Sequence, residues 1–474
     1  MSDSPVKMPR LWLTSGALPI LWGALYVGAF PPVGMRFLVP VALLGLLHCL
    51  RGLEPVAARC AGFLFGMTVM TLGCSWLHNI FGGIFLGLAA LHALFYGLFG
   101  WGHAIIERQG WGGATKALAI ACTWTGVEYI RAEHFWLDFP WMTPGHGLAV
   151  IPCLTQPLLA TIGVYGVGFV LVLVCAWVVR KEWKGVQIIT PPRVLIALGL
   201  IPILSDLSWM ASRDRSHSLP TVSFAAIQSE SGWLHQFSET TEALKDKPDL
   251  VIWPEESLPY DIVKAAKDWA RLESLVKKQQ CVLVMGTQQG GEGKAWFNTA
   301  LTLDETGILG RHFKNHPVHL FNDGTPGTEA HPVATRIGKI GTPICFDCDY
   351  QDVVRRMTLE GADFFAVPSM DPVRWGPLQR LQHAELFRIR AAENGRAMVV
   401  CATSGVTQVI DPWGGLVSML EPLKDGVLTG VIPIRTGITI YTCYGWLFPW
   451  IALVAAILFI VQALRSERDT RVAA

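Results

Sequence analysis

The stretch KIGTPICFD, residues 339–347, runs from a β-favouring apolar segment directly into a cysteine and an aspartate. Two other stretches have the same form: DLVIWPE, residues 249–255, ends in Glu255, and GILGRHFK, residues 307–314, ends in Lys314. Each pattern predicts a buried strand that ends in a chemically reactive side chain. If the three strands belong to one sheet, an acid, an amine and a thiol converge on one pocket.

These stretches lie in residues 211–436, which have the character of an ordinary globular domain. Short runs of β-branched and apolar residues recur there, and helical patterns over 263–279 and 376–394 separate several of them. The mixture predicts a layered α/β domain with buried sheets. The other predicted strand segments are TVSFAAIQ (221–228), CVLVMGTQ (281–288), NTALTLD (298–304), residues 334–346, ADFFAVPS (362–369), AMVVCATSG (397–405) and VLTGVIPI (427–434).

The rest of the chain is much more apolar. Of all 474 residues, 51% are hydrophobic and only 16% are charged, which is wrong for a soluble enzyme. A helix needs roughly 20 apolar residues to cross a bilayer, so the sequence predicts a transmembrane bundle of seven spans at 1–210, the globular domain at 211–436, and a closing span with a tail at 437–474. The predicted spans lie near 11–30, 34–50, 60–80, 83–106, 116–132, 155–179, 194–210 and 438–464.

Lysine and arginine concentrate in alternate connecting segments, which indicates the cytoplasmic side of a membrane. The opposite short loops contain only Arg36 and Arg131. We therefore expect both termini in the cytoplasm and the domain at 211–436 on the other side, which in a bacterium is the periplasm. The basic residues behind this orientation are Lys7, Arg10, Arg51, Arg59, Arg108, Lys116, Arg180, Lys181, Lys184, Arg193, Arg465, Arg468 and Arg471.

Several classes of partner are not indicated by the sequence. The net charge of +1 gives no sign of nucleic-acid binding. The 13 histidines form no metal-binding spacing on any one helix, and the chain has no glycine-rich phosphate loop, so we expect neither a metal nor a cofactor. The 11 cysteines are odd in number and partly spread through apolar helices, which is not a disulfide framework.

Motifs from both halves of the chain form an ordered series. They are AFPPVGM (29–35), VEYIRAEHFWLDFPWMTPG (127–145), GVYGVGFV (163–170), VIWPEESLP (251–259), PICFD (343–347), RAAENGR (390–396) and VTQVIDPWG (406–414). The series resembles the bacterial apolipoprotein N-acyltransferases, whose catalytic domain is of the nitrilase superfamily of carbon–nitrogen hydrolases. The resemblance covers almost the whole chain. It implies a membrane α-helical bundle of about eight spans joined to an α/β nitrilase-like αββα sandwich domain.

The resemblance also implies a catalytic trio. The superfamily's glutamate, lysine and cysteine fall on Glu255, Lys314 and Cys345. A free thiol is mostly protonated at neutral pH, so a carboxylate must accept its proton or a cation must lower its pKa. Glu255 is then the base, and the Lys314 ammonium stabilises the oxyanion formed when the thiolate attacks an ester. The product is a thioester on Cys345, from which an amine can take the acyl chain.

Substrates and further site residues come from the same resemblance. A phospholipid would donate the acyl chain, and the N-terminal amine of a diacylglyceryl-cysteine apolipoprotein would accept it, at the bacterial inner membrane. Asp347 stands where the family has a glutamate two residues after the nucleophile, and Asp323 replaces a glutamate of a loop that reads PVHLFNDGTPG here (317–327). Trp141 and Trp375 either line the lipid entrance or anchor the chain at the membrane interface.

Alternatives stay open for these residues and for the activity. Cys345 has the alternative of a buried packing residue, Glu256 is a rival to Glu255, and Lys314 has the alternative of a solvated strand end. Cys348 is either a neighbour of the nucleophile or the second thiol of a redox pair. If water takes the acyl group, the protein is a membrane-anchored amidase or hydrolase. If the site is degenerate, the protein is a non-enzymatic membrane partner.

Overall fold

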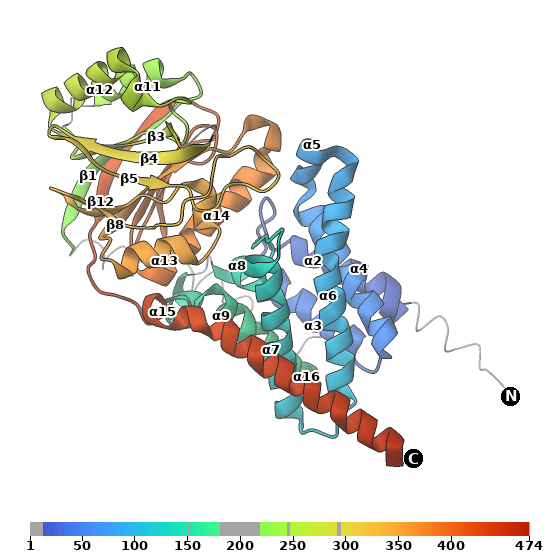
Figure 1. Cartoon of the computed structure of the whole chain (residues 1–474). Helices are drawn as coiled ribbons and strands as arrows, with labels where there is room; N and C mark the ends of the chain where they lie inside the picture. The colour runs from blue at the N-terminus through green and yellow to red at the C-terminus, as the bar shows by residue number, and fades with distance from the viewer. Residues whose placement is uncertain (1–12, 150–151, 181–218, 244–246, 292–294, 474) are drawn as a thin grey trace. The chain divides into compact units, whose positions relative to one another are not determined.

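Figure 1 shows the computed structural model of the protein, with apolar helices in one part of the chain and strands in another. The chain divides into two units. One consists of residues 1–151, 162–204 and 446–474, and the other consists of 152–161 and 205–445. The structure describes residues 13–149, 152–180, 219–243, 247–291 and 295–473.

The apolar parts of the chain are helical. Four helices in the described part of the chain are long and apolar enough to cross a membrane: Pro55–Gly73, Ser75–Glu107, Thr155–Arg180 and Gly445–Asp469. Continuous apolar sequence of this length is what a bilayer core requires. The assigned helices are α2 (Leu18–Val27), α3 (Leu38–Leu50), α4 (Pro55–Gly73), α5 (His78–Phe81), α6 (Phe85–Glu107), α7 (Gly113–Tyr129), α8 (Pro144–Ala149), α9 (Pro152–Arg180) and α16 (Phe448–Ala473).

Seven of the eight predicted spans overlap helices in the described part of the structure, and four of these helices are long enough to cross a membrane. Those near 60–80, 83–106, 155–179 and 438–464 overlap the four long apolar helices. Those near 11–30 and 34–50 overlap two shorter apolar helices, Thr14–Val27 and Leu38–Leu50, and the one near 116–132 overlaps α7, which has 17 residues. The span predicted at 194–210 lies outside the described residues. The total of about eight spans therefore stays a prediction.

The strand-containing unit is built on two six-stranded sheets. Their strand orders are β12-β1-β2-β3-β4-β5 and β11-β10-β9-β8-β7-β6. In each sheet the three central strands, β1-β2-β3 and β7-β8-β9, pair in parallel, and the outer strands pair antiparallel. The strands are β1 (Thr221–Gln228), β2 (Leu250–Ile252), β3 (Val282–Gly290), β4 (Trp296–Asp304), β5 (Gly307–Phe313), β6 (Val333–Thr335), β7 (Gly338–Gly341), β8 (Phe364–Ser369), β9 (Met398–Ala402), β10 (Gln408–Ile410), β11 (Leu416–Met419) and β12 (Gly426–Pro433).

The alternation of side chains along the strands builds the core of this unit. Successive residues of a strand point to opposite faces. Phe224 and Ile252 of the first sheet therefore pack against Val399 of the second sheet, in the apolar layer between the sheets. Val251, the neighbour of Ile252, packs on the outer face with Leu272 of helix α12 (Ala266–Gln279). Strands β2, β8 and β9 are buried along their whole length, which explains their almost continuous apolar sequence.

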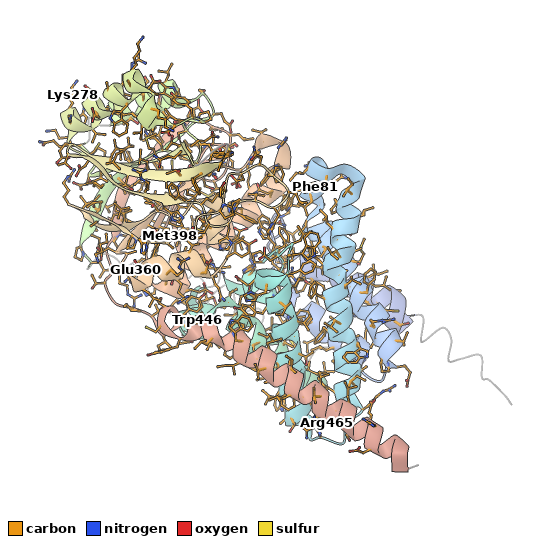
Figure 2. All side chains as sticks on the ribbon, viewed as in Figure 1. Phe81, Lys278, Glu360, Met398, Trp446 and Arg465 are labelled. Carbon is orange, nitrogen blue, oxygen red and sulfur yellow. The ribbon has the colours of Figure 1, made fainter. Side chains whose placement is uncertain are left out.

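The second sheet has a matching outer layer. Met398, which Figure 2 labels, and Val400 of β9 pack with Phe387 of helix α14 (Pro377–Asn394). The layers therefore follow the order helix, sheet, sheet, helix, as the αββα sandwich requires. Helical patterns predicted at 263–279 and 376–394 are confirmed as α12 and α14. The remaining helices of this unit are α11 (Trp233–Ala243), α13 (Asp352–Leu359) and α15 (Ile440–Cys443).

Two details of the strand prediction are wrong. The segment 334–346 is not one strand, because β6 and β7 form a hairpin and β7 ends at Gly341. The three reactive strand ends also do not share a sheet. Strands β2 and β5, which precede Glu255 and Lys314, belong to the first sheet, whereas β7, which precedes Cys345, belongs to the second. The site is therefore assembled from the edges of both sheets, and sequence spacing alone could not distinguish this from one sheet.

Gly286 on β3 lies directly beneath the turn that follows β2. A Cβ atom at this position would stand 2.5 Å from the Pro254 oxygen, 2.5 Å from the Glu256 nitrogen and 2.6 Å from the Glu255 Cα. All three atoms are backbone atoms, so none can move aside by changing a rotamer. The backbone N–H of Gly286 also donates to the Pro254 oxygen at 3.1 Å. The close approach of β3 to this turn therefore needs a residue without a side chain.

We expect Gly286→Ala to destabilise the protein by about 1–3 kcal/mol, the usual cost of forcing extra volume into a packed interior. Thermal unfolding of the detergent-solubilised protein measures the effect. Gly290→Ala on the same strand is the matched control, because a Cβ there would meet only the flexible Lys264 ammonium, at 3.0 Å, and the Asp261 carboxylate. Equal unfolding temperatures for the two variants would contradict the tight packing inferred at Gly286.

Candidate active site

Lys314 is a buried cation held between two carboxylates. Its Nζ lies 2.7 Å from Glu255 Oε1 and 2.7 Å from Asp323 Oδ2. Asn298 completes the group, because its side-chain amide donates to Glu255 Oε1 at 2.7 Å and to Asp323 Oδ1 at 2.9 Å. Lys314 and Glu255 are each only 2% exposed. A buried charge is tolerated when it is paired in this way.

Backbone hydrogen bonds of the first sheet position these side chains. Glu255 follows β2 at a turn that is tied to β3 by the bond from Gly286 N to the Pro254 oxygen. Lys314 follows β5, and its N–H donates to the Asn298 oxygen of β4 at 2.9 Å. Its own carbonyl accepts from Gly327 N at 2.8 Å, which closes the loop that carries Asp323. Strands β2, β5 and β4 of the first sheet thus present the acid, the amine and the amide at one place.

Burial and neighbouring charges set the protonation of the pair. Burial raises the pKa of Glu255 to about 7, an effect that the Lys314 ammonium opposes and the Asp323 carboxylate reinforces. Burial alone would lower the pKa of Lys314, but the Glu255 and Asp323 carboxylates raise it well above its ordinary value. Lys314 is therefore a permanent cation, whereas Glu255 can gain and lose a proton near neutral pH.

The two oxygens of Glu255 have different surroundings. Oε1 accepts from both Lys314 and Asn298. Oε2 is buried, and no donor in the described part of the chain reaches it. A carboxylate with one anchored oxygen and one uncommitted oxygen is oriented and still able to take up a proton. This arrangement is what a general base requires.

Cys345 lies in a strained turn after β7. It begins a short 3-10 helix, Cys345–Cys348, and has a φ of 47°, which is unusual for a residue with a side chain. The side chain is buried against Ala300 of β4, two residues from Asn298, and against Ile344. Its Sγ donates to the Met370 oxygen at 3.5 Å. The thiol is thus anchored next to the strand that holds the Glu255 amide partner.

The charges of the site act on the Cys345 thiol. Burial raises its pKa well above the ordinary value, and the Glu255 carboxylate raises it further, while Lys314 lowers it. The resting side chain is therefore a protonated thiol and not a stable thiolate. To become a nucleophile it must transfer its proton during attack, and a carboxylate with a pKa near neutrality is a suitable acceptor.

Asp347 lies two residues after Cys345 and is fully buried. Its carboxylate accepts from the backbone N–H groups of Ile344, Asn315 and His316 and contacts His312 Nε2 at 2.8 Å. Burial would raise its pKa, but the His312 hydrogen bond and charge lower it. Asp347 thereby ties the turn of the cysteine to the segment that carries Lys314.

The two rival residues have other surroundings. The half-buried Glu256 accepts from the Gln288 side chain at 3.0 Å, so the carboxylate paired with Lys314 is that of Glu255. Cys348 is fully buried in the apolar layer beneath helices α13 and α14, whereas Cys345 packs on Ala300. Both cysteines are free thiols. The surroundings of Cys348 are those of a packing residue.

Trp375 and Trp141 lie in different units. The Trp375 ring packs against Phe321 of the loop that carries Asp323, with ring centroids 5.5 Å apart. Trp141 stacks on Phe139 at 5.4 Å.

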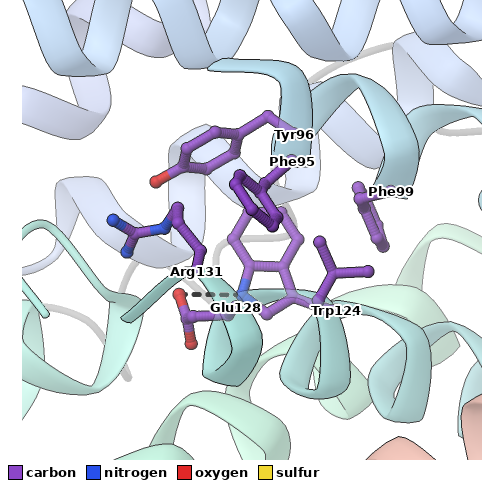
Figure 3. A pocket seen from close by; sticks show the side chains of 7 residues that line it. Phe95, Tyr96, Phe99, Trp124, Glu128 and Arg131 are labelled. Carbon is purple, nitrogen blue, oxygen red and sulfur yellow. Dashed lines mark hydrogen bonds between the residues drawn. The ribbon is translucent and has the colours of Figure 1, made fainter. Parts of the chain in front are cut away.

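Arg131 fixes the turn that carries Trp141, because its guanidinium donates to the Phe139 and Trp141 oxygens at 2.8 and 3.1 Å. Figure 3 shows Arg131 beside Glu128 in a pocket of the helical unit that is lined mainly by aromatic side chains. Glu128 accepts there from the Trp124 indole at 3.3 Å. The pocket therefore combines one acidic and one basic side chain with an aromatic wall.

Sequence reasoning missed Asn298 and the Met370 carbonyl. A buried asparagine inside an otherwise apolar and threonine-rich strand, NTALTLD, was the available signal, because asparagine is depleted in strands. The carbonyl has no sequence signal, because every residue has one. Among the described residues no group of three or more histidine, cysteine, aspartate or glutamate side chains is arranged to hold a metal ion.

Two protein families match the chain in succession. Residues 22–177 match the apolipoprotein N-acyltransferase N-terminal domain, and residues 220–440 match the carbon–nitrogen hydrolase family. Among solved structures, the chain is similar to a carbon–nitrogen hydrolase from Helicobacter pylori, with 21% identity, a TM-score of 0.39, and coverage of 45% of this chain and 89% of that one. An amidase from Nesterenkonia sp. has 18% identity and a TM-score of 0.40, with 45% and 90% covered.

Curated relatives match along almost their full length. An apolipoprotein N-acyltransferase of Photobacterium profundum is 23% identical over 506 residues, which cover 95% of this chain and 96% of the relative. That of Vibrio cholerae is 25% identical over 512 residues, which cover 92% and 96%. With both domain families present in order and relatives of one kind along the whole chain, the protein belongs to the apolipoprotein N-acyltransferase family, within the nitrilase superfamily.

Proposed function

We propose that this protein is an apolipoprotein N-acyltransferase that moves an acyl chain from a phospholipid, through a thioester on Cys345, to the N-terminal amine of a diacylglyceryl-cysteine lipoprotein. The observation that carries the proposal is the buried pair of Glu255 and Lys314, braced by Asp323, whose two charges act on the buried Cys345 thiol. Relatives with both domains bear the name of this activity. The trio of Glu255, Lys314 and Cys345 is our assignment for the catalytic residues.

The first half-reaction forms the thioester. Glu255 Oε2 takes the thiol proton as Cys345 Sγ attacks the ester carbonyl of the phospholipid. Negative charge develops on the carbonyl oxygen, and the Lys314 ammonium stabilises it, an effect commonly worth roughly 3 kcal/mol per well-placed donor. The intermediate then expels the lysophospholipid oxygen, which receives the proton from Glu255. The acyl–sulfur bond replaces the acyl–oxygen bond, and no other reactant is needed.

The second half-reaction uses the thioester. The amine of the acceptor attacks the thioester carbonyl, Lys314 again faces the developing oxyanion, and Glu255 removes a proton from the attacking nitrogen. The departing thiolate of Cys345 recovers that proton. Because the site is buried, water is disfavoured as a competing acceptor. The products are an amide on the acceptor and the resting thiol.

The other assigned residues support this chemistry without reacting. Asp323 takes the place of the loop glutamate by anchoring Lys314, and Asp347 positions the nucleophile turn. Trp375 packs on Phe321 beside the Asp323 loop, which suits a wall that contacts an acyl chain, and Trp141 is proposed to face lipid in the membrane part. These roles are proposals based on contacts within each unit.

We also propose the membrane arrangement. The chain is a multi-pass inner-membrane protein of about eight spans, with the bundle at 1–210, the catalytic domain at 211–436 in the periplasm, and the closing span with its tail at 437–474. Both termini are cytoplasmic. The apolar helices support the membrane assignment, and the distribution of lysine and arginine in the sequence supports the orientation.

The first test is an acyl adduct. We expect the purified protein, incubated with a phospholipid, to gain the mass of one acyl chain in a hydroxylamine-sensitive linkage. Cys345→Ala should abolish the adduct, because the nucleophile is gone, and Cys348→Ala should retain it. Glu255→Gln should slow its formation by about 100-fold or more, the usual contribution of a general base. Intact-mass measurement of the wild type and each variant over time gives the amount of acyl adduct.

Adding an acceptor peptide distinguishes the proposed acyl transfer from hydrolysis. Adding a diacylglyceryl-cysteine peptide should discharge the adduct and acylate the peptide amine, whereas a hydrolase would release free fatty acid at the same rate with or without peptide. A folded wild-type protein that never forms an adduct would contradict the enzyme assignment and favour a non-enzymatic partner.

The pH dependence of acylation tests Glu255 as the base. Only ionised Glu255 accepts a proton, so the rate should rise with pH and level off above the pKa of about 7. Asp323→Asn removes a charge that raises this pKa, so the midpoint should move to lower pH. Glu256→Gln is the control, because its charge is the smallest contribution and the midpoint should move less. A midpoint that rises in Asp323→Asn would exclude Glu255 as the titrating group.

Reporter fusions test the orientation. A fusion at residue 215 should report the periplasm and a fusion after Ala474 the cytoplasm, because the basic segments stay inside. An enzymatic reporter active only in the periplasm and a fluorescent reporter active only in the cytoplasm give opposite signals at the two sites. If both sites report the cytoplasm, the periplasmic location proposed for residues 211–436 is wrong, and with it the proposed acylation of lipoproteins on that side.

A further inference from the structure

A second charged cluster, formed by His383, Asp349 and Asp371, takes no part in the chemistry described so far. His383 of α14 is buried, with 2% of its surface exposed. Its Nδ1 lies 2.8 Å from Asp371 Oδ1, and its Nε2 lies 3.2 Å from Asp349 Oδ1. One imidazole ring therefore bridges two carboxylates, and both carboxylates are themselves buried.

Both carboxylates belong to the segments that hold the nucleophile. Asp349 follows the short helix that begins at Cys345, and its N–H donates to the Phe346 oxygen at 3.0 Å. Asp371 directly follows Met370, whose carbonyl accepts from the Cys345 thiol at 3.5 Å. Two segments therefore fix the Cys345 thiol: the turn that carries it and the segment with the Met370 carbonyl to which it donates. Both segments contact His383.

Asp371 is held in place by two further hydrogen bonds. Asp371 Oδ1 accepts from the Gln379 side chain at 2.7 Å, and the Asp371 carbonyl accepts from Ser404 Oγ at 2.6 Å. Burial would lower the pKa of His383, but the Asp371 and Asp349 charges raise it to about 10. The ring is therefore cationic at neutral pH and balances the carboxylates by charge as well as by contact.

The cysteine turn needs such anchors because its backbone is strained. A positive φ at a residue with a side chain persists only where the surroundings hold it. Asp347 holds the turn from the side of Lys314, through Asn315 and His316. Asp349 holds it from the opposite side, through His383. The nucleophile lies between these two attachments.

We propose that His383 is a positioning residue for the acyl transfer: by bridging Asp349 and Asp371 it fixes the Cys345 thiol for proton transfer to Glu255. This inference rests on the proposed function. His383 does not act on the substrate, because each of its ring nitrogens faces a carboxylate. Its loss leaves the reacting groups present but misaligned, and a small displacement of a nucleophile has a large effect on rate.

The test compares His383→Gln with the double variant His383→Gln and Asp349→Asn. The single variant leaves two buried carboxylates, Asp349 and Asp371, without their cation, which lowers stability. The double variant removes the Asp349 charge, and Asp371 keeps its hydrogen bond from Gln379, so the unfolding temperature should return towards that of the wild type. The rate of acyl-adduct formation should nevertheless stay about 10- to 100-fold below wild type in both variants, because the bridge is absent. The apparent KM for phospholipid should be unchanged.

Alkylation of Cys345 by iodoacetamide gives a readout that does not need acyl transfer. In the Cys348→Ala background, peptide mass analysis should show slower modification of Cys345 in both His383 variants and a changed pH profile. His331→Gln is the control, because this exposed histidine pairs with Glu360 at the surface and should leave every rate unchanged. Wild-type alkylation and acylation rates in the double variant would overturn the positioning role. A wild-type protein that alkylates normally but never acylates would instead refute the proposed function.

Discussion

One buried ammonium paired with two carboxylates sets the geometry of the candidate site in the strand-containing unit. Lys314 can remain charged in the interior only because Glu255 and Asp323 both lie 2.7 Å away and Asn298 bonds to both acids. Desolvating any of these charges alone would be costly. Four positions from three strands and one loop must therefore come together, and the packing of Gly286 under the Glu255 turn follows from the same requirement.

The low polarity of the buried site makes this pairing necessary, and it also sets the protonation of Cys345 and Glu255. Burial keeps the Cys345 side chain as a thiol, and it raises the pKa of Glu255 to about 7. In the proposed mechanism, this protonated thiol stays unreactive until a substrate arrives. In the proposed mechanism the proton then moves over a short path, and the fixed ammonium faces the negative charge that develops. In this mechanism, burial of the site both keeps Cys345 protonated at rest and gives Glu255 the pKa that lets it accept the thiol proton.

The reactive turn is held by carboxylates on both sides. Asp347 connects it to the segment of Lys314, and Asp349 connects it to His383 and so to the segment of Met370. The candidate site residues come from both sheets, so their relative positions depend on these polar contacts and also on the apolar packing between the sheets.

Local sequence patterns predicted the apolar helices, the strands before Glu255 and Lys314 and, through ordered motifs, the assignment of Glu255, Lys314 and Cys345 as candidate catalytic residues. Those features follow from local periodicity, composition and short motifs, which need no knowledge of distant contacts. Long-range contacts were needed to show that the thiol and the acid come from different sheets, that Cys345 lies in a strained turn instead of a strand, that Asn298 bonds to Glu255, and that His383 pairs with Asp371. These depend on pairings between residues far apart in the chain, whose partners no local pattern specifies.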